Sequence, residues 1–500
     1  MESRQGGIRV GVDVGGTFTD AVAIGPGIHA TAKVPTTDPE AAGVLDAIDR
    51  VLDRSGVAAS DVDAMGHAST VATNAIIERN GARTALVTTA GFRDVLEIGR
   101  QDRPSLYDLR VERSPPLVPR RRRYELDERT PPPGRETPRR RPDPEAIDTL
   151  AEALEGCEAV AVALLHADHD DDHERQIAER LESHLDVPIV RSGAVLPTVR
   201  EYERTATTVA SAYLTPVMAN YLEAVVDGCH DRHLPAPRVM QSNGGVAEVS
   251  AIVDRAVTAV LSGPAAGVVG ARGYAAEHDA LDPGAITLDM GGTSADIGIV
   301  DASGVARTDE TVVADVPVRI PVVDVTTVGA GGGSIAWIDD GGALRVGPAS
   351  AGADPGPACY GRGGDRPTVT DAAVLLGYLD DGIELGGAIA IDGAAARSAL
   401  RELAEAGDLG GPEAAAVGIL RVAEATMVRA IRTVTVEAGR DPREHALVAF
   451  GGAGGMVATG LADRLDIDRI VLPDAGGVLS AEGLVTADER HDAVQSNPGR

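Results

Sequence analysis

Two short apolar runs flank a polar, glycine-containing octapeptide near the N-terminus. The runs cover residues 8–12 and 21–24, and the octapeptide of residues 13–20 reads DVGGTFTD. Apolar runs on both sides of a glycine turn predict a β-hairpin. Glycines at its tip, Gly15 and Gly16, let backbone N–H groups approach an anion closely, and Asp13 and Asp20 could hold a divalent cation that screens the phosphate charge. The tip, which also carries the hydroxyl of Thr17, is therefore predicted to suit phosphate binding.

The same pattern occurs again in the second half of the chain. Residues 289–296 read DMGGTSAD, and strand-like runs precede and follow them. The two octapeptides share five of eight positions, which are Asp, Gly, Gly, Thr and the final Asp. The second copy contributes Asp289, Gly291, Gly292 and Thr293. Two such hairpins predict two homologous lobes that close on a nucleotide between them.

Strand-like and helix-like patterns alternate through much of the chain, which predicts an α/β fold. Helices are expected over residues 38–52, 69–81, 172–185 and 200–226, the last with a kink or break at Pro216. Near the C-terminus a strand at residues 446–450 leads into a glycine turn at 451–455 and a helix. Such a turn lets adenine or ribose lie against the backbone, and its candidate nucleotide-binding residues are Gly451, Gly452 and Gly454.

Length and composition narrow the class of protein. Five hundred residues with an apolar fraction of 43% are typical of a globular chain of several domain-sized units. The expected division is residues 1–200 for the first lobe, 201–490 for the second and 491–500 for a tail. No apolar run approaches the roughly 20 residues that span a bilayer. Because the first strand begins at residue 8, we expect no signal peptide and a cytoplasmic location.

The chain is strongly acidic and almost free of lysine. Its net charge is −30, and Lys33 is its only lysine among 46 basic residues. This composition resembles that of salt-accumulating halophiles, in which salt screens the repulsion between surface carboxylates. The acidity argues against nucleic-acid binding. The three cysteines match no metal or redox spacing and are expected to be reduced thiols.

Two polar segments each allow two interpretations. Residues 112–143 contain the arginine runs 120–123 and 139–141, which suit either an anion-binding arm or an exposed hairpin or insertion. Residues 166–174 are rich in histidine and aspartate, which suits either a metal site or an ordinary helix start. For both segments we favour the second interpretation.

The order of the two phosphate motifs and the late glycine turn resembles that of the actin, heat-shock chaperone and sugar-kinase superfamily. Within it, longer motifs resemble the hydantoinase A/5-oxoprolinase family, which includes a subunit of acetone and acetophenone carboxylases. The resemblance runs from about residue 8 to 490. Its motifs cover residues 11–20, 70–75, 91–101, 262–267, 289–296, 328–334, 354–361 and 450–454.

The resemblance implies two duplicated RNase H-like, actin-like ATPase lobes with a nucleotide cleft between them. It implies ATP-dependent opening of a cyclic amide such as hydantoin, N-methylhydantoin or 5-oxoproline: phosphoryl transfer to the carbonyl oxygen gives an activated imidate that water attacks. Mg²⁺ or Mn²⁺ is expected at Asp13 and Asp289. A separate B-type subunit and an oligomeric assembly are also implied. Alternatives are a ketone carboxylase subunit, a catalytically weakened ATP-binding regulator and a small-molecule kinase.

The chain departs from the family pattern at three places. Thr326 and Val457 stand where the family has histidine, and residues 67–70 read HAST instead of HGTT. A C-terminal domain that follows the ATPase core in the family is expected to be absent. These departures leave the phosphate motifs intact and put substrate or metal roles of the missing histidines in doubt.

Several single residues are candidates for the substrate side of the site. His67 is expected at the active cleft, with a buried histidine satisfied by its neighbours as the alternative. Arg93, Asp94 and Arg100 lie on an expected helix and following turn within residues 93–101 and could line a substrate pocket, or could be solvated helix-face residues. Cys359 is not expected to be a nucleophile, because only Arg362 adjoins it among basic residues.

Overall fold

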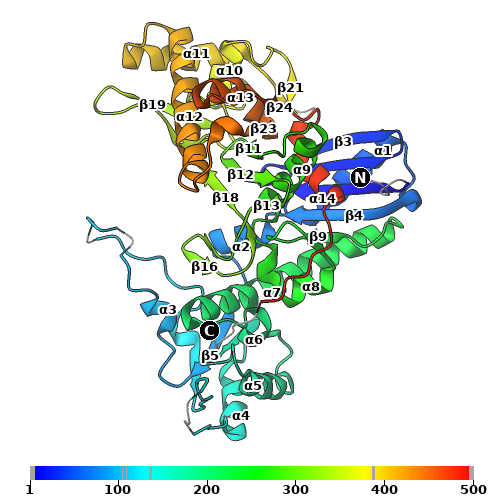
Figure 1. The fold of residues 1–500 in the computed structure, drawn as a ribbon, viewed down its shortest axis with the longest axis vertical. Helices are drawn as coiled ribbons and strands as arrows, with labels where there is room; N and C mark the ends of the chain where they lie inside the picture. Colours follow the sequence, from blue (N-terminus) through cyan, green and yellow to red (C-terminus); the bar gives the residue numbers. More distant parts are fainter. Residues whose placement is uncertain (1–5, 104, 109, 135–137, 386–388, 495–500) are drawn as a thin grey trace. The chain divides into compact units, whose positions relative to one another are not determined.

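The computed structural model describes residues 6–103, 105–108, 110–134, 138–385 and 389–494, which form two compact units (Figure 1). The first unit combines residues up to 66 with 263–306 and 323–487, and the second combines 67–262 with 307–322 and the residues from 488. Each unit is assembled from stretches far apart in the sequence. These units are groups of residues that pack compactly together. The predicted division at residue 200 instead cuts the sequence into two successive lobes, and it stays a prediction.

The first unit begins with an antiparallel meander that contains the first octapeptide. Strands β1 (Ile8–Val14), β2 (Phe18–Gly25) and β3 (Ile28–Pro35) follow one another, and β4 (Val62–Ser69) adjoins β1, which gives the order β3-β2-β1-β4. Helix α1 (Glu40–Ser55) packs on this sheet through a buried stripe that includes Val44, Ile48 and Val51. Apolar strand residues thus face a helix, as the sequence pattern predicts.

A second sheet in the same unit repeats this arrangement around the second octapeptide. Its order is β13-β12-β11-β23-β24, from β13 (Gly304–Val305), β12 (Ala295–Asp301), β11 (Ala285–Met290), β23 (Ala446–Phe450) and β24 (Ile470–Val471). As β4 adjoins β1 in the first sheet, β23 adjoins β11 here, and β23 pairs with β11 in parallel. The predicted α/β fold with duplicated RNase H-like sheets is confirmed.

Two helices of the first unit approach each other closely through glycines. Helix α9 (Ser262–Glu277) and helix α14 (Leu479–Thr486) meet where Gly483 lies against the backbone of Ala266 and Gly270. A β-carbon on Gly483 would lie 2.0 Å from the carbonyl oxygen of Ala266. Helix α14 also packs on β1, where Gly11 contacts Ala481. Small residues are thus needed at these crossings.

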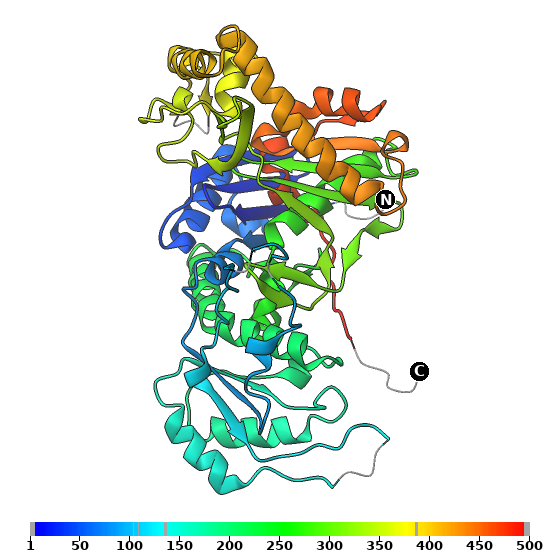
Figure 2. The same ribbon diagram turned by 90° about the vertical axis from the view of Figure 1, so that its left-hand side faces the viewer.

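Helices cover the second sheet and enclose a large apolar core. Long helix α12 (Pro412–Thr435) packs on β12 and α13, and Figure 2 shows it running obliquely across this part of the unit. Helix α13 (Gly451–Leu465) begins directly at Gly451. The predicted glycine turn at 451–455 is therefore wrong in one respect: these residues form the first turn of the helix. The other elements that follow β12 here are β18 (Val325–Val328), β19 (Ser334–Ile338), β20 (Leu344–Ser350), α10 (Val369–Leu375), β21 (Glu384–Leu385), β22 (Ile389–Ala390) and α11 (Gly393–Gly407).

The second unit is built on a parallel four-stranded sheet. Its order is β6-β5-β7-β8, from β6 (Arg123–Leu126), β5 (Thr84–Thr89), β7 (Ala159–Ala163) and β8 (Ile189–Arg191). Helix α7 (Glu201–Asp231) contains Pro216 and continues past it, so the break expected there is not found.

Other helices are α2 (Val71–Ile77), α3 (Val95–Ile98), α4 (Pro144–Ala153), α5 (Asp172–Glu182), α6 (Ser192–Val195) and α8 (Val249–Asp254). Further strands are β9 (Arg238–Met240), β10 (Val246–Ala247), β14 (Arg307–Thr308), β15 (Thr311–Val313) and β16 (Val316–Val318), and β17 (Val322–Val323) follows them.

The arginine-rich segment is only partly an exposed insertion. Strand β6 belongs to the sheet, and the side chain of Arg123 is buried. Residues 135–137 of this segment, and residues 495–500 of the expected tail, lie outside the described residues. Among the described residues no helix is both long and apolar enough to cross a membrane.

Candidate functional site

The two hairpin tips have the same backbone geometry. Gly15 donates its N–H to the carbonyl oxygen of Phe18 at 2.9 Å, and Gly291 donates to Ser294 at 3.0 Å. The aspartates also pair alike, with Asp13 opposite Asp20 and Asp289 opposite Asp296. The tip residues at equivalent positions are exposed; they are Gly16, Thr17, Gly292 and Thr293. A β-carbon at Gly16 or Gly292 would meet no atom within 4 Å, so both tips are open to a ligand.

Carboxylates of both hairpins influence one another within the first unit. Burial, followed by repulsion from Asp20 and Asp289, raises the pKa of Asp13 to about 8. Burial, followed by repulsion from Asp296 and Asp20, raises the pKa of Asp289 to about 7. The two repeated motifs therefore lie close enough in this unit to interact electrostatically.

Lys33 is the basic residue within this carboxylate group. It forms an ion pair with Asp20, its direct neighbour across β2 and β3, and it lies 5.1 Å from the centre of the Phe18 ring. Its charge lowers the pKa values of Asp13 and Asp289, but burial and the other carboxylates dominate. One lysine among four aspartates leaves the group short of positive charge.

The carboxylate group has features that fit a divalent cation beside bound phosphates. One buried carboxylate oxygen of Asp13, Oδ1, has no hydrogen-bond partner among the described residues. No cluster of three or more His, Cys, Asp or Glu side chains in the described part of the chain could hold a metal by itself. Mg²⁺ commonly takes only one or two carboxylates and completes its shell with water and substrate phosphates. The residues present therefore fit a nucleotide-bound cation better than a permanent metal centre.

Gly451 at the start of α13 contacts the second hairpin. Its φ is +80°, and a β-carbon there would lie 2.3 Å from Asp289 Oδ1. The parallel pairing that places Phe450 opposite Asp289 brings the helix start to this position. The free N–H groups of a helix N-terminus favour anions. The second hairpin and the glycine segment at 451–455, two of the three predicted nucleotide motifs, thus meet in one place. Within that segment Gly452 has open space around it, and Gly454 packs on β11.

A second glycine segment supports the same tip from the other side. Gly332 donates its N–H to Gly291 O at 2.9 Å, and Gly333 donates to Gly292 O at 2.6 Å. A β-carbon at Gly331 would lie 2.6 Å from the carbonyl carbon of Gly292. These hydrogen bonds fix the carbonyl groups of Gly291 and Gly292 at the tip.

The structure places His67 in the second unit, buried inside it. Its Nε2 lies 2.8 Å from the hydroxyl of Tyr221, and its side chain is almost fully buried. This environment agrees with the alternative of a histidine satisfied by its neighbours. A catalytic role for His67 stays a prediction.

The candidate substrate residues lie in the second unit and differ in their surroundings. Arg93 lies 3.6 Å from Glu125, and Asp94 accepts two hydrogen bonds from Arg120. Arg100 pairs with Glu203 and lines a cavity of about 850 Å³. Helix α3 is only four residues long and forms part of the helix and turn expected here. Of the three, only Arg100 borders this cavity, and their role stays a prediction.

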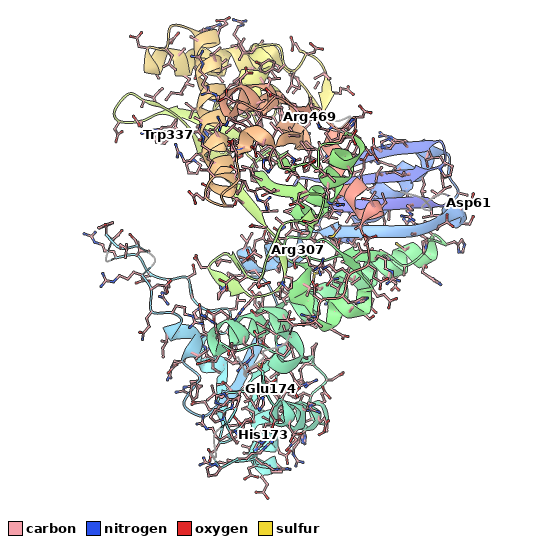
Figure 3. The ribbon with its side chains drawn as sticks, viewed as in Figure 1. Asp61, His173, Glu174, Arg307, Trp337 and Arg469 are labelled. Atoms are coloured by element: carbon pink, nitrogen blue, oxygen red, sulfur yellow. The ribbon has the colours of Figure 1, made fainter. Side chains whose placement is uncertain are left out.

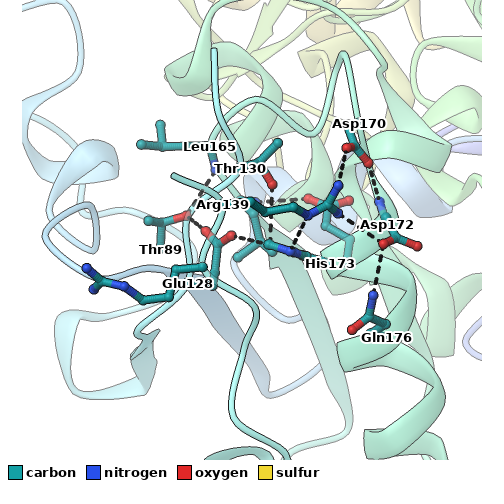
Figure 4. Close-up of polar contacts among 12 residues, drawn as sticks. Thr89, Glu128, Thr130, Arg139, Leu165, Asp170, Asp172, His173 and Gln176 are labelled. Atoms are coloured by element: carbon teal, nitrogen blue, oxygen red, sulfur yellow. Dashed lines mark hydrogen bonds and ion pairs between the residues drawn. The ribbon is translucent and has the colours of Figure 1, made fainter. Parts of the chain in front are cut away.

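The histidine- and aspartate-rich segment is a hydrogen-bonded helix start. Asp172 begins α5, and the next residue, His173, contacts Glu128 at 2.7 Å through Nδ1 and accepts from Arg139 at 2.9 Å (Figure 4). Its neighbour Glu174, labelled in Figure 3, is buried and accepts hydrogen bonds from Ser192 and Gly193. These contacts agree with the favoured interpretation as a helix start.

Several residues near the hairpins were not among the candidates. They are Lys33, Gly263, which faces Asp13, and Thr327, which donates to Asp296 at 2.6 Å. The uniqueness of Lys33 was a signal that could have drawn attention to it. The structure also describes the two residues that stand where the family has histidine. Thr326, on β18, lies opposite Ile297, and Val457 is fully buried in the core.

Comparisons with known proteins agree with this architecture. A family model described as Hydantoinase/oxoprolinase matches residues 204–493, and one described as its N-terminal region matches residues 9–185. The chain is 38% identical to caprolactamase subunit alpha of Pseudomonas jessenii, over 98% of this chain and 72% of the relative. It is 34% identical to 5-oxoprolinase of Saccharomyces cerevisiae, over 97% of this chain but only 41% of that longer protein.

Two solved structures are also similar to this chain over nearly all of its length. The crystal structure of ATP-dependent caprolactamase from Pseudomonas jessenii matches with a TM-score of 0.86 and 36% identity, covering 97% of this chain and 71% of that one. A nucleotide-free acetone carboxylase matches with a TM-score of 0.80 and 25% identity, covering 96% and 70%. Because the family models cover most of the sequence and the caprolactamase relative is 38% identical over 98% of this chain, the chain belongs to the hydantoinase/oxoprolinase family.

Proposed function

We propose that this chain is the ATP-hydrolysing subunit of an enzyme that opens a cyclic amide or imide. The carrying observation is the pair of equivalent hairpin tips, open at Gly16 and Gly292 and backed by interacting carboxylates. The similarity to caprolactamase and 5-oxoprolinase supports a lactam, hydantoin or 5-oxoproline as substrate. We further propose a cytoplasmic oligomer with a B-type partner subunit, since a relative is named as a subunit.

Each motif has a distinct role in this proposal. Backbone N–H groups at the two tips and the hydroxyls of Thr17 and Thr293 bind phosphate oxygens. The start of α13, with Gly451, Gly452 and Gly454, holds the nucleoside end. Asp13 and Asp289 hold Mg²⁺ or Mn²⁺, directly or through water; when bound, the cation offsets charge during phosphoryl transfer.

The reaction uses ATP to overcome the poor reactivity of an amide carbonyl. Transfer of the γ-phosphoryl group to the amide oxygen releases ADP and gives an imidate phosphate. Water adds to that carbon and the ring C–N bond breaks, which releases the amine and leaves an acyl phosphate. A second water hydrolyses the acyl phosphate to a carboxylate and inorganic phosphate. His67 and the cavity-lining Arg100 are candidates for the substrate side.

The test is phosphate release from ATP by the purified chain with its B-type partner. Hydantoin, N-methylhydantoin, 5-oxoproline and caprolactam are each added, at low and at high salt. We expect one of them to stimulate release and to yield the ring-opened product. Asp13→Asn and Asp289→Asn should each lower turnover by about 100-fold or more, because the cation loses a ligand. The exposed Asp61, labelled in Figure 3, gives the control Asp61→Asn, which should retain full activity.

A second candidate is a ketone carboxylase subunit. It is favoured by the match to acetone carboxylase and by 34% identity to the acetophenone carboxylase gamma subunit of Aromatoleum aromaticum. Stimulation by acetone or acetophenone with bicarbonate, and by no cyclic amide, would replace the first proposal with this one. Tight ATP binding without stimulation by any substrate would indicate a regulator, and a stable phosphorylated product in phosphorus NMR would indicate a kinase.

A further inference from the structure

The arginine run at residues 120–123 contains two residues with carboxylate partners and two without. Arg120 donates from Nε to Asp94 at 2.8 Å, and the buried Arg123 donates from Nη2 to Glu97 at 2.8 Å. The side chains of Arg121 and Arg122 form no hydrogen bond or ion pair with any described residue. Arg120 and Arg123 therefore stabilise the local fold through these contacts, whereas Arg121 and Arg122 make no such contact.

Arg121 and Arg122 line a hollow of about 750 Å³ in the second unit. Arg79 and Arg83 line the same hollow, which brings four guanidinium groups to one place. Arg79 is held by a hydrogen bond to Pro115 O at 2.9 Å. The side chain of Arg83, like those of Arg121 and Arg122, has no partner among the described residues. A volume of this size is typical of small-molecule sites.

The hollow is deficient in negative charge even though the chain is strongly acidic. Its lining contains one carboxylate, Glu158, which accepts a hydrogen bond from the backbone N–H of Arg83 at 2.6 Å. The Nε of Arg122 is buried without an acceptor. Burial lowers the pKa of Arg122, and the charges of Arg121 and Arg83 lower it further, although the nearby Cys157 raises it. An unsatisfied buried donor of a charged group is costly. A bound anion would remove that cost and the mutual repulsion together.

We propose that this hollow binds a multiply charged oxyanion of a small molecule bearing phosphate or carboxylate groups. Guanidinium groups match such oxygens with paired, charge-assisted hydrogen bonds. The hollow lies in the second unit, whereas the phosphate hairpins lie in the first. None of its lining residues belongs to the predicted nucleotide site, so the proposal adds a second anion site to the chain.

The test is calorimetric titration of the full chain with pyrophosphate and, separately, with citrate. A metal-free buffer low in chloride is used, because chloride competes for guanidinium groups and, without a cation, no metal can bridge the probe to Asp13 and Asp289. Arg83→Ala and Arg121→Ala should each weaken binding by about tenfold or more, since each removes a charge-assisted hydrogen bond. Arg121→Lys keeps the charge but not the fork and should recover part of the affinity.

Arg120→Ala is the matched control, because it removes the same charge from the same arginine run. Unlike Arg121, however, Arg120 already pairs with a carboxylate, that of Asp94. It should leave anion affinity within about twofold of wild type, and thermal melts check that every variant is folded. Crystals soaked in tungstate should show anomalous scattering beside Arg83 and Arg121. Tighter binding of pyrophosphate would assign a phosphate ligand, and tighter binding of citrate a carboxylate ligand.

Three results would overturn the proposal. The first is that wild-type protein binds neither probe. The second is equal affinity in Arg83→Ala, Arg121→Ala and wild type. The third is a loss of affinity in Arg120→Ala as large as in those two variants. The last result would mean general attraction of anions to the arginine run, without a defined site.

Discussion

At the scale of single residues, Asp13 combines partial burial with repulsion from Asp20 and Asp289. The raised pKa means that the folded chain without ligand favours the protonated carboxyl group. The stabilising effect of that proton is complete below the unfolded value of 3.8 and is lost as the pH rises towards about 8. A bound cation would replace the proton there, which links the stability of the site to its ligand.

Asp13→Asn should therefore stabilise the ligand-free protein more strongly at high pH. The amide cannot ionise, so its advantage over wild type grows between pH 4 and 8 and then levels off at roughly 2 kcal/mol, allowing for solvent screening. Denaturant unfolding at a series of pH values measures this difference. Asp61→Asn serves as the control, and a constant difference between Asp13→Asn and wild type across the range would contradict the expectation.

The sequence predicted this residue because the repeated octapeptide is contiguous, so spacing alone identified Asp13 and Asp289. It could not predict that Lys33 pairs with Asp20, because that contact depends on the register of β2 and β3. It also could not place Gly451 beside Asp289, because the parallel pairing of β11 and β23 joins segments far apart in the chain. Local motifs are readable from sequence, whereas contacts set by long-range register are not.

At the scale of elements, the crossing of α9 and α14 depends on glycine. Gly483→Ala should destabilise the protein by about 1–3 kcal/mol, because its β-carbon would overlap the backbone of Ala266. Gly273→Ala in α9 is the matched control: nothing lies within 4 Å of its β-carbon, and alanine should stabilise the helix by about 0.5–1 kcal/mol. Thermal unfolding of both variants measures this contrast, and equal effects would contradict the close packing.

Element boundaries show the same limit of local reasoning. The strands of both hairpins were predicted, since glycine turns between apolar runs are strong local signals. The start of α13 at Gly451 was missed because five residues including four glycines suggest a turn by propensity, and only packing against β11 makes them helical. Similarly, β6 was missed because Arg123 is a charged residue buried by its contacts with Glu97 and Val118.

At the scale of the whole molecule, a net charge of −30 should make stability depend on salt. Raising KCl from about 0.1 M to about 2 M shortens the screening length to a few ångströms and weakens repulsion between carboxylates. We expect KCl to raise the melting temperature by more than sucrose does at the same osmolality, since sucrose strengthens burial without screening charge. A flat or falling melting temperature would contradict the interpretation of this surface as salt-adapted.

The ion pair between Lys33 and Asp20 has a practical consequence. Since Lys33 is the only lysine of the chain, an amine-reactive reagent finds one ε-amino group, and its side chain is 31% exposed. Apart from the α-amino group of the chain, this is the amine that such a reagent labels, so a label can be placed beside the first hairpin without engineering the protein. Peptide mass spectrometry of the labelled chain would then follow how ligands and salt alter access to that amine.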